Sequence, residues 1–207
     1  MNIKTLEVAG IAPAIIAMRN PMNSWDRIDS IPGRVGKNDK ALSMRLAKAG
    51  TEHCKHLRMV VVWADITAPF YWWKQFDTYR IGVEKVSCST MHKMMSRPVT
   101  FDDFEHDRLR EEVFEDNVIR HINLAITAYK DEEDPEMKAR LFRGVIQLLP
   151  ESYLQKRTVM MSYAALRGIY KQRKGHKLPE WQIFREWVES LPESWMITDK
   201  EEEETDE

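Results

Sequence analysis

The spacing of apolar and polar residues along the chain predicts a mixture of strands and helices. The run from Leu57 to Ile66 is rich in β-branched and aromatic residues, and its three consecutive valines favour a strand that is buried on both faces. Shorter runs predict two further strands, over 3–8 and 155–162. Apolar side chains at helical spacing predict helices over 11–18, 38–50, 69–79, 101–130, 134–148, 163–174 and from Pro179 onward.

The stretch from Arg19 to Lys40 interrupts this pattern. It concentrates Asn, Pro, Gly, Ser and Asp, which is the composition of an irregular loop. A loop of more than about 15 residues inside a compact domain is usually functional or mobile, and we expect one of these roles here. Asn38 or Asp39, near the end of the loop, is expected to cap the helix that follows.

Two pairs of residues give more local predictions. Thr100 and Asp103 have the spacing of a capping box, so a helix is expected to begin there. Trp72 and Trp73 are adjacent on a predicted helix, where neighbouring side chains point in different directions. We therefore expect one of the two tryptophans to contact a ligand or a partner subunit.

Length and charge suggest how the chain is organised. Its 207 residues fit one domain with its own core, and 43% apolar and 31% charged residues are typical of globular proteins. The net charge of −2 is uneven, because residues 199–207 carry −6 and the rest carries +4. We expect a single domain over 1–198 and a disordered acidic tail over 199–207. The small positive charge of the domain argues against a nucleic-acid partner.

Cysteine usage and hydropathy bear on the compartment. Cys54 and Cys88 are too few for a disulfide framework and fit free thiols in a reducing compartment. No apolar run approaches the roughly 18 residues that a membrane span needs. The first residues also lack the pattern of a signal peptide. We predict a cytoplasmic protein without a membrane partner.

Four small polar residues in a row form the first candidate for chemistry. Ser87, Cys88, Ser89 and Thr90 would let backbone N–H groups approach an anion, and their hydroxyls can donate as well, so the segment could hold a phosphate. An ordinary serine-rich turn is the alternative. Cys88 itself is either a nucleophile or a buried structural thiol.

Basic and histidine-rich segments form the second and third candidates. Residues 167–177 hold six basic side chains, which suit either phosphate binding or a solvated helix face. The run His53-Cys54-Lys55-His56 places two imidazoles and a thiol close together. A zinc site needs further ligands elsewhere, and the sequence offers no second Cys/His pair, so we predict no metal.

One stretch matches a known motif. Ala68-Pro69, Gln75 and Arg80 fit the pattern A-P-x-x-x-x-x-Q-x-x-R-H-R without a gap. Thr78 and Tyr79 stand where the motif has its first Arg and its His. This motif belongs to the flavin-dependent thymidylate synthases, and the chain resembles that family.

The resemblance continues, in order, over residues 40–190. Cys88 falls opposite the family's active-site Ser, and Thr90 replaces the Arg that follows. Residues 18–25 and 87–93 are also similar to uncharacterised proteins of bacteriophages and prophages of Gram-positive bacteria. Further matches, some shifted by a few positions, are Ala49-Gly50-Thr51-Glu52-His53, Leu149-Pro150, Arg173, His176 and Trp181-Gln182-Ile183.

The resemblance implies an α+β fold, a curved and mainly antiparallel sheet flanked by long helices, assembled as a homotetramer. It implies a nucleotide-modifying enzyme that uses FAD and acts on a pyrimidine deoxynucleotide such as dUMP, to which the family transfers a methylene group from a folate. Cys88 and Arg173 would be catalytic. Nucleotide binding would fall to Gln75, Ser87, Ser89, Thr90 and Arg173, and flavin binding to His53, Tyr79, Arg80 and His176.

Three alternatives remain open at this stage. A thiolate at Cys88 could add to the pyrimidine ring, as in the unrelated folate-dependent thymidylate synthases. The chain could instead be a non-catalytic nucleotide-binding homologue that has lost flavin binding, because the family's Arg-His pair is replaced at Thr78 and Tyr79. It could also be a phage-encoded interaction protein that uses its oligomer surface and its acidic tail.

Overall fold

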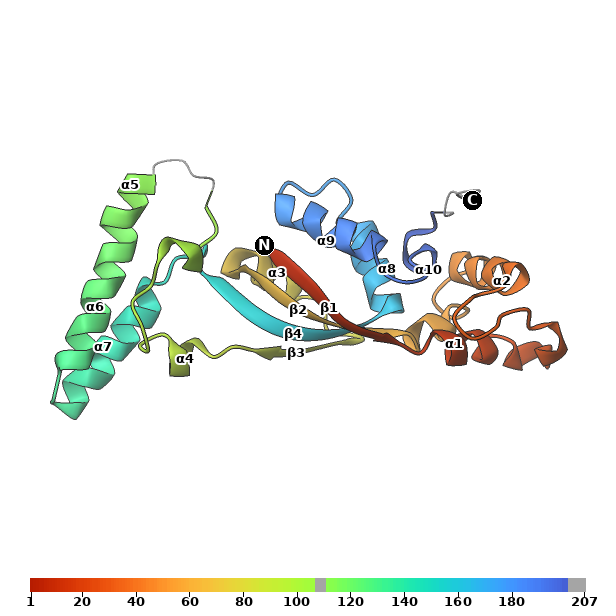
Figure 1. The fold of residues 1–207 in the computed structure, drawn as a ribbon, viewed down its shortest axis with the longest axis horizontal. Helices are drawn as coiled ribbons and strands as arrows, with labels where there is room; N and C mark the ends of the chain where they lie inside the picture. Colours follow the sequence, from red (N-terminus) through yellow and green to blue (C-terminus); the bar gives the residue numbers. More distant parts are fainter. Residues whose placement is uncertain (107–110, 201–207) are drawn as a thin grey trace. The chain divides into compact units, whose positions relative to one another are not determined.

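The computed structural model describes residues 1–106 and 111–200, with an α+β fold built on an open antiparallel sheet (Figure 1). The predicted fold class is confirmed. The sheet has the order β1-β2-β4-β3, which places β2 and β4 at its centre. The strands are β1 (Asn2–Ala9), β2 (Val61–Pro69), β3 (Val83–Ser87) and β4 (Leu154–Ser162).

Strand β2 differs from its prediction in two ways. It begins at Val61, because Lys55–Arg58 form a 3-10 turn in place of the expected first residues. Along β2, buried residues alternate with half-buried ones, so one face is buried completely and the other only in part. The three valines therefore mark one buried face rather than two.

The helices are placed largely where apolar spacing predicts them. The expected helix over 101–130 is interrupted, since Phe101–Asp103 form only a 3-10 turn and a π-helical turn over Glu115–Ile119 joins two α-helices. The capping box of Thr100 and Asp103 is present on that short turn. The α-helices are α1 (Ile11–Ala17), α2 (Lys37–Lys48), α3 (Phe70–Phe76), α4 (Thr90–Lys93), α5 (Glu111–Phe114), α6 (Arg120–Asp131), α7 (Pro135–Leu148), α8 (Tyr163–Gln172), α9 (Pro179–Glu189) and α10 (Trp195–Thr198).

The chain divides into two compact units, whereas the sequence predicts one domain. The first unit comprises residues 1–2, 67–77 and 87–157. The second comprises residues 3–66, 78–86 and 158 to the end of the described chain. Because β2 and β4 contribute residues to both units, the division falls within strands and not at a linker, which is why composition gives no sign of it.

In the first unit, the helical hairpin of α6 and α7 contributes to a core of Met94, Val99, Phe104, Ile119, Ile122, Ile126 and Val145.

Helix α3 buries both of its adjacent tryptophans, with Trp72 and Trp73 exposed by 0% and 1%. Trp72 stacks on Phe76, while the indole N–H of Trp73 donates to the carbonyl of Gln155 at 2.9 Å. The guanidinium of Arg157 covers the Trp73 ring at 4.2 Å.

The expectation that one of these tryptophans meets a ligand or a partner is therefore wrong. Their rings contact each other edge to face at 4.9 Å, and residues of β4 in the same unit cover Trp73. Adjacent apolar residues can both be buried when a short helix is covered on two sides.

In the second unit, helices α8, α9 and α10 bury large aromatic side chains, among them Trp181, Phe184 and Trp195. The start of the acidic tail belongs to this unit. Asp199 accepts from Arg167 at 2.7 and 2.8 Å and pairs with Lys171 at 3.0 Å. The expected tail boundary at residue 199 is thus two residues early at least, since Lys200 also pairs with Glu189. Residues 201–207 lie outside the described part of the chain.

Among the described residues, no helix is both long enough and apolar enough to cross a membrane.

Candidate functional site

The residues singled out from the sequence fall into both units. The first unit holds Gln75, Ser87, Cys88, Ser89 and Thr90. The second unit holds the remaining candidates, which are His53, Tyr79, Arg80, Arg173 and His176.

In the second unit, the structure brings Tyr79 and Arg173 together. Tyr79 follows α3 in the chain, and Arg173 ends α8, so residues 94 positions apart meet here. The Nε–H of Arg173 donates to the Tyr79 hydroxyl at 2.8 Å. The same guanidinium lies over the ring of buried Trp181, 4.2 Å from its centroid. A hydrogen bond and a cation–π contact therefore fix the plane of this cation.

His176 lies at the edge of this cluster. Its ring is 6.0 Å from that of Trp181, and its Nδ1 accepts from the backbone N–H of Leu178 at 3.1 Å. Burial and the neighbouring charge of Arg173 lower the pKa of His176, and Glu180 opposes this shift. This shift favours the neutral imidazole, whose proton lies on Nε2 because Nδ1 is an acceptor.

Tyr79 and Arg80 line a cavity of about 770 Å³ together with residues of α8. The turn that carries them is fixed to the start of that helix, since Gly82 accepts from the backbone N–H of Ser162 at 2.9 Å. Gly82 has a φ of +70°, and an added Cβ would lie 2.5 Å from the Ser162 hydroxyl, so only glycine fits. The lining is mostly apolar, and it also includes the side chain of Arg58.

His53 lies on a different cavity. That cavity measures about 940 Å³ and is lined by His53, His56 and several basic side chains, including Arg27 and Arg45. Cys54 instead lines the cavity of Tyr79. The His-Cys-Lys-His run therefore divides between two cavities, and the described residues contain no group of three metal-ligating side chains.

His56 is buried, and its Nε2 lies 2.7 Å from the hydroxyl of Ser43. Burial lowers the pKa of His56 to about 4, so this imidazole is neutral at physiological pH.

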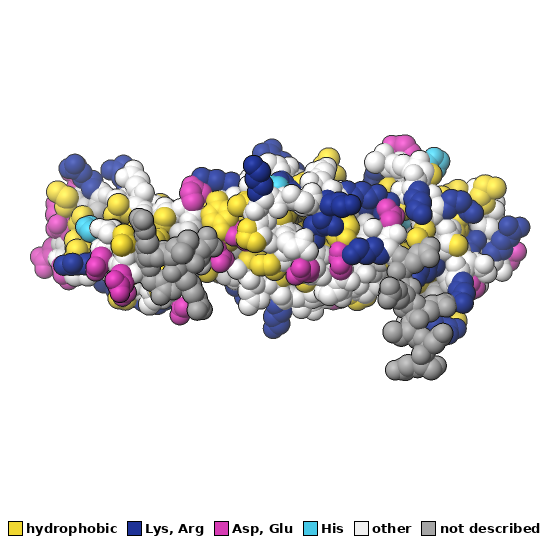
Figure 2. Space-filling model, turned by 90° about the horizontal axis from the view of Figure 1, so that it is seen from above, with side chains coloured by type: hydrophobic (Ala, Val, Ile, Leu, Met, Phe, Trp, Pro, Cys, Tyr) yellow, Lys and Arg dark blue, Asp and Glu magenta, His cyan; other side chains and the backbone are white. Residues whose placement is uncertain are grey.

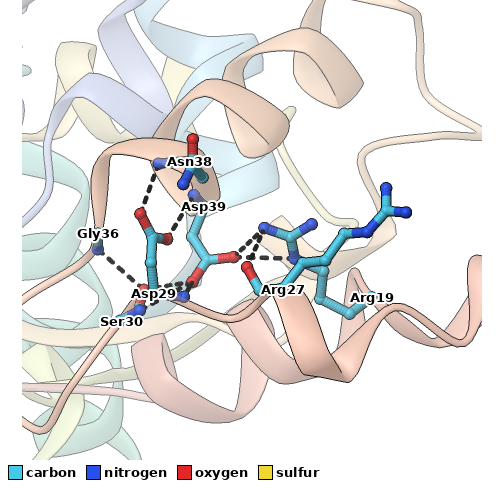
Figure 3. Close-up of polar contacts among 7 residues, drawn as sticks. All are labelled: Arg19, Arg27, Asp29, Ser30, Gly36, Asn38 and Asp39. Atoms are coloured by element: carbon cyan, nitrogen blue, oxygen red, sulfur yellow. Dashed lines mark hydrogen bonds and ion pairs between the residues drawn. The ribbon is translucent and has the colours of Figure 1, made fainter.

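The 19–40 loop forms one wall of the larger cavity, and a buried ion pair holds it (Figure 3). Arg19 donates to one carboxylate oxygen of Asp39 through Nε and Nη2, at 2.9 and 2.6 Å. The second oxygen accepts from the backbone N–H groups of Asp29 and Ser30, both at 3.1 Å, and from the Ser30 hydroxyl at 2.7 Å. Ion pairing thus orders a segment that composition describes only as irregular.

This network corrects the predicted helix cap. Helix α2 begins after Gly36, and the Asp29 carboxylate accepts from the N–H groups of Asn38 and Asp39 at 2.8 and 3.0 Å. The hydrogen bond from the Asn38 backbone, with others of this network, holds the pKa of Asp29 below its usual range, against the opposing effect of burial. The cap is therefore a side chain from within the loop, and Asp39 serves the ion pair instead.

In the first unit, the serine-rich segment is fixed to β4. The backbone N–H of Cys88 donates to the carbonyl of Lys156 at 2.9 Å, and the Cys88 carbonyl accepts from the Gln155 side chain at 2.9 Å. The Cys88 thiol is exposed, so the alternative of a buried structural thiol is wrong. Gln75 and Thr90 are each partly exposed.

The side chains of the basic segment over 167–177 differ in their surroundings. Arg167 is buried and its charge is paired with Asp199, so it supports the fold. Lys171, Lys174 and Lys177 are exposed, which fits the solvated face that was one of the two expectations. Figure 2 shows Lys and Arg side chains on the visible face of the molecule. Arg173 joins the aromatic cluster, and His176 lies at its edge.

Two partners of the candidate residues carry little signal in the sequence. Gln155 holds the Cys88 backbone from a strand without a motif, and nothing in its surroundings marks it. The pairing of Tyr79 with Arg173 joins distant positions that a single sequence cannot connect.

No protein-family model matches the chain, and no curated protein matches it either. Solved structures do match. A structure of thymidylate synthase X from Helicobacter pylori with FAD and dUMP superposes with a TM-score of 0.74 over 96% of this chain and 98% of that one, at 15% identity. The chain has the thymidylate synthase X fold.

A second structure gives the same result. The flavin-dependent thymidylate synthase X from Helicobacter pylori, complexed with FAD and dUMP, matches with a TM-score of 0.74 at 16% identity, over 96% of this chain and 99% of that one. At such identities the likeness establishes the thymidylate synthase X fold and confirms this part of the resemblance. The likeness to phage proteins stays a prediction.

Proposed function

We propose that the chain binds a pyrimidine deoxynucleotide such as dUMP and modifies it as a thymidylate synthase-like enzyme. The observation that carries the proposal is the match of nearly the whole chain to structures of an enzyme with FAD and dUMP. The cluster of Tyr79, Arg173 and Trp181 supports it, because an oriented guanidinium is well suited to a phosphate or to a base edge.

Each unit holds its own candidates for nucleotide contacts. In the first unit Gln75 would contact a nucleotide, and in the second Arg173 would do so and would act in catalysis by holding it in place. The segment of Ser87, Ser89 and Thr90 would hold the phosphate through hydroxyls and backbone N–H groups. The attachment of this segment to β4 supports the role, because a fixed backbone loses little entropy on binding.

FAD is the proposed cofactor, and the cavity beside Tyr79 and Arg80 has the properties that it requires. About 770 Å³ of mostly apolar lining suits a planar ring system, and Arg58 and Arg80 suit its phosphates. Tyr79, Arg80 and His176 would hold the flavin, with His53 assigned through the family resemblance. When bound, a flavin supplies hydride chemistry.

Cys88 is the proposed nucleophile. Its exposed thiol can reach a ligand, and a thiolate can add to the pyrimidine ring. Replacing Cys88 with alanine should abolish turnover and leave dUMP affinity within about two-fold of wild type. Cys54→Ala removes the other thiol, which is buried and lines the cavity proposed for FAD, so its FAD affinity is measured together with its turnover. Turnover retained by Cys88→Ala would contradict the nucleophile role.

A non-catalytic nucleotide-binding homologue is the second candidate. The observation that favours it is the loss of the Arg-His pair at Thr78 and Tyr79, since hydrogen bonds to charged groups contribute roughly 1.5–3 kcal/mol each.

One experiment separates the two candidates. The purified protein is titrated with FAD and with dUMP, and absorbance is recorded from the near-ultraviolet to the blue while dUMP binding is followed by calorimetry. Saturable binding of both ligands supports the enzyme, and binding of dUMP alone supports the non-catalytic homologue. A protein that takes up neither ligand refutes the proposed function.

We also propose that the chain assembles as a homotetramer. Leu124, Met137 and Leu148 on the hairpin of α6 and α7 are large apolar side chains that are at least 41% exposed. Exposed apolar side chains that form one contiguous patch are typical of a surface that a partner covers, and the proposal expects these three to belong to such a patch. Light scattering should give about four times the mass of 24.4 kDa, and a monomer at micromolar concentration would contradict this assembly.

A further inference from the structure

The cavity of about 940 Å³ beside the 19–40 loop takes no part in the proposed function, apart from the assignment of His53. Every residue that lines it belongs to the second unit. The loop, helix α2 and the 3-10 turn over Lys55–Arg58 all contribute to its walls. Pockets for small organic ligands measure roughly 300–1,000 Å³, so this cavity is large enough for one.

The buried part of the lining contains a ring nitrogen without a partner. Met18, Arg19 and His56 are buried residues of the lining. Arg19 is paired with Asp39, whereas the buried Nδ1 of His56 has no hydrogen-bond partner in the described chain. The other ring nitrogen, Nε2, lies 2.7 Å from the Ser43 hydroxyl. Because buried polar atoms are almost always hydrogen-bonded, Nδ1 points to a group that the chain itself does not supply.

Three exposed cations line the same cavity. The side chains of Arg27, Arg45 and Lys55 form no hydrogen bond or ion pair with any residue of 1–106 and 111–200. Figure 3 shows the Arg27 guanidinium extending away from the ion pair of Arg19 and Asp39. Arg27 contributes only its backbone carbonyl there, which accepts from Arg19 at 3.1 Å. These cations therefore keep their donors for an anion.

Two carboxylates, those of Asp26 and Glu52, also line the cavity. Over the part of the chain that the structure describes, neither of them pairs with a lysine or an arginine. The lining thus offers separate sites for negative charge and for hydrogen-bond donors. Such a mixture favours a ligand that carries both over a simple inorganic anion, which the carboxylates would repel.

We infer that this cavity binds an aromatic organic anion that also carries N–H donors, at a site distinct from those proposed for dUMP and FAD. The anionic group would lie at Arg27, Arg45 and Lys55. The ring would lie beside Met18 and would supply the hydrogen-bond partner of the His56 Nδ1. Phosphates and carboxylates both fit a guanidinium fork, so the experiment has to distinguish these two anionic groups.

The test measures the binding of three probes by isothermal titration calorimetry. ATP combines an amino-bearing ring with phosphates, 5-aminoisophthalate combines such a ring with carboxylates, and inorganic tripolyphosphate has no ring. We expect saturable binding of at least one of the two aromatic probes, tighter than the binding of tripolyphosphate. The aromatic probe that binds more tightly identifies the anionic group and is used with the variants.

Two substitutions test the cations. Arg45→Gln should weaken binding of the aromatic probe about ten-fold, because a hydrogen bond between charged groups is lost. Arg34→Gln is the matched control, since Arg34 is an exposed arginine of the same unit that lines a different cavity. Its affinity for the probe should equal that of wild type. Arg45→Gln should also bind dUMP and FAD as wild type does.

A third substitution tests the ring contact. In His56→Gln, the side-chain amide can still reach Ser43 but has no nitrogen at the position of Nδ1. Binding of the aromatic probe should weaken about five-fold, and binding of tripolyphosphate should not change. Far-ultraviolet circular dichroism at the assay temperature checks that this variant is folded.

Several results would overturn the inference. Neither aromatic probe binds, tripolyphosphate binds as tightly as the aromatic probe, or Arg45→Gln and Arg34→Gln weaken binding equally. Loss of FAD binding together with the aromatic probe in Arg45→Gln would assign the cavity to the cofactor and overturn the separate site. Wild-type protein that binds an aromatic probe but neither dUMP nor FAD would refute the proposed function and leave this inference in place.

Discussion

Replacing Arg19 with alanine tests how the 19–40 loop is held on α2. The substitution leaves the Asp39 carboxylate, which is 0% exposed, with its three contacts to Asp29 and Ser30 but without a counter-charge. Arg19 itself is 7% exposed, so water screens the pair little. Breaking a buried ion pair on one side costs about 3–5 kcal/mol, because a charge stays buried and uncompensated.

The matched substitution is Arg97→Ala. Arg97 also pairs with a carboxylate, that of Asp103, but its side chain is 60% exposed. Exposed pairs contribute about 0.2–1 kcal/mol. Urea unfolding followed by far-ultraviolet circular dichroism should therefore separate the two variants by at least about 2 kcal/mol. In thermal unfolding, Arg19→Ala should lower the Tm by roughly 10 °C.

A further substitution isolates the charge. Asp39→Asn in the Arg19→Ala background keeps an oxygen acceptor for Asp29 and Ser30 but removes the unpaired negative charge. The double variant should recover part of the lost stability. Equal losses for Arg19→Ala and Arg97→Ala, or no recovery with Asp39→Asn, would refute the reasoning that burial makes this pair strong.

Two further predictions concern the second half of the loop and the buried histidine. Gly36→Ala would place a Cβ 2.3 Å from the Asp29 carboxyl carbon, so thermal unfolding should show that the protein loses about 1–3 kcal/mol of stability. Gly144→Ala, in α7, is the control: its Cβ would have nothing within 4 Å, and the protein should gain about 0.5–1 kcal/mol of stability. His56 has a folded-state pKa of about 4 and an unfolded value near 6.5, so its contribution is present above about pH 6.5 and is lost as the pH falls toward 4. Urea unfolding between pH 4 and 7 should show a steeper loss for wild type than for His56→Gln; parallel curves would contradict this.

Three of the four strands and most helices could be predicted because local patterns specify them, whereas β3 (Val83–Ser87) was not predicted. The valine run marks β2, and Pro179 marks the first residue of α9, with errors of a few residues at the ends. The helix cap at Gly36 could not be predicted in this way. Asp39 has the right residue type and place for a cap, and only the ion pair with Arg19, 20 positions earlier, gives it another role.

Which residues of the candidate site contact each other could not be predicted from local patterns either. The motif places Tyr79 and Arg173 among the candidates, but the resemblance assigns Tyr79 to the flavin and only Arg173 to the nucleotide. Neighbouring residues can also separate, since His53 and Cys54 line different cavities although they are consecutive. Residue type predicts which groups can do chemistry, whereas the fold decides which of them meet.

Arg167 and Arg173 make the point most clearly, because residue type cannot distinguish them. Both belong to the same basic segment of the sequence. The Asp199 carboxylate accepts from the first in support of the fold, while the Tyr79 phenol accepts from the second and the Trp181 ring stacks on it. Among the basic residues of this segment, the search for a phosphate ligand should therefore begin at Arg173.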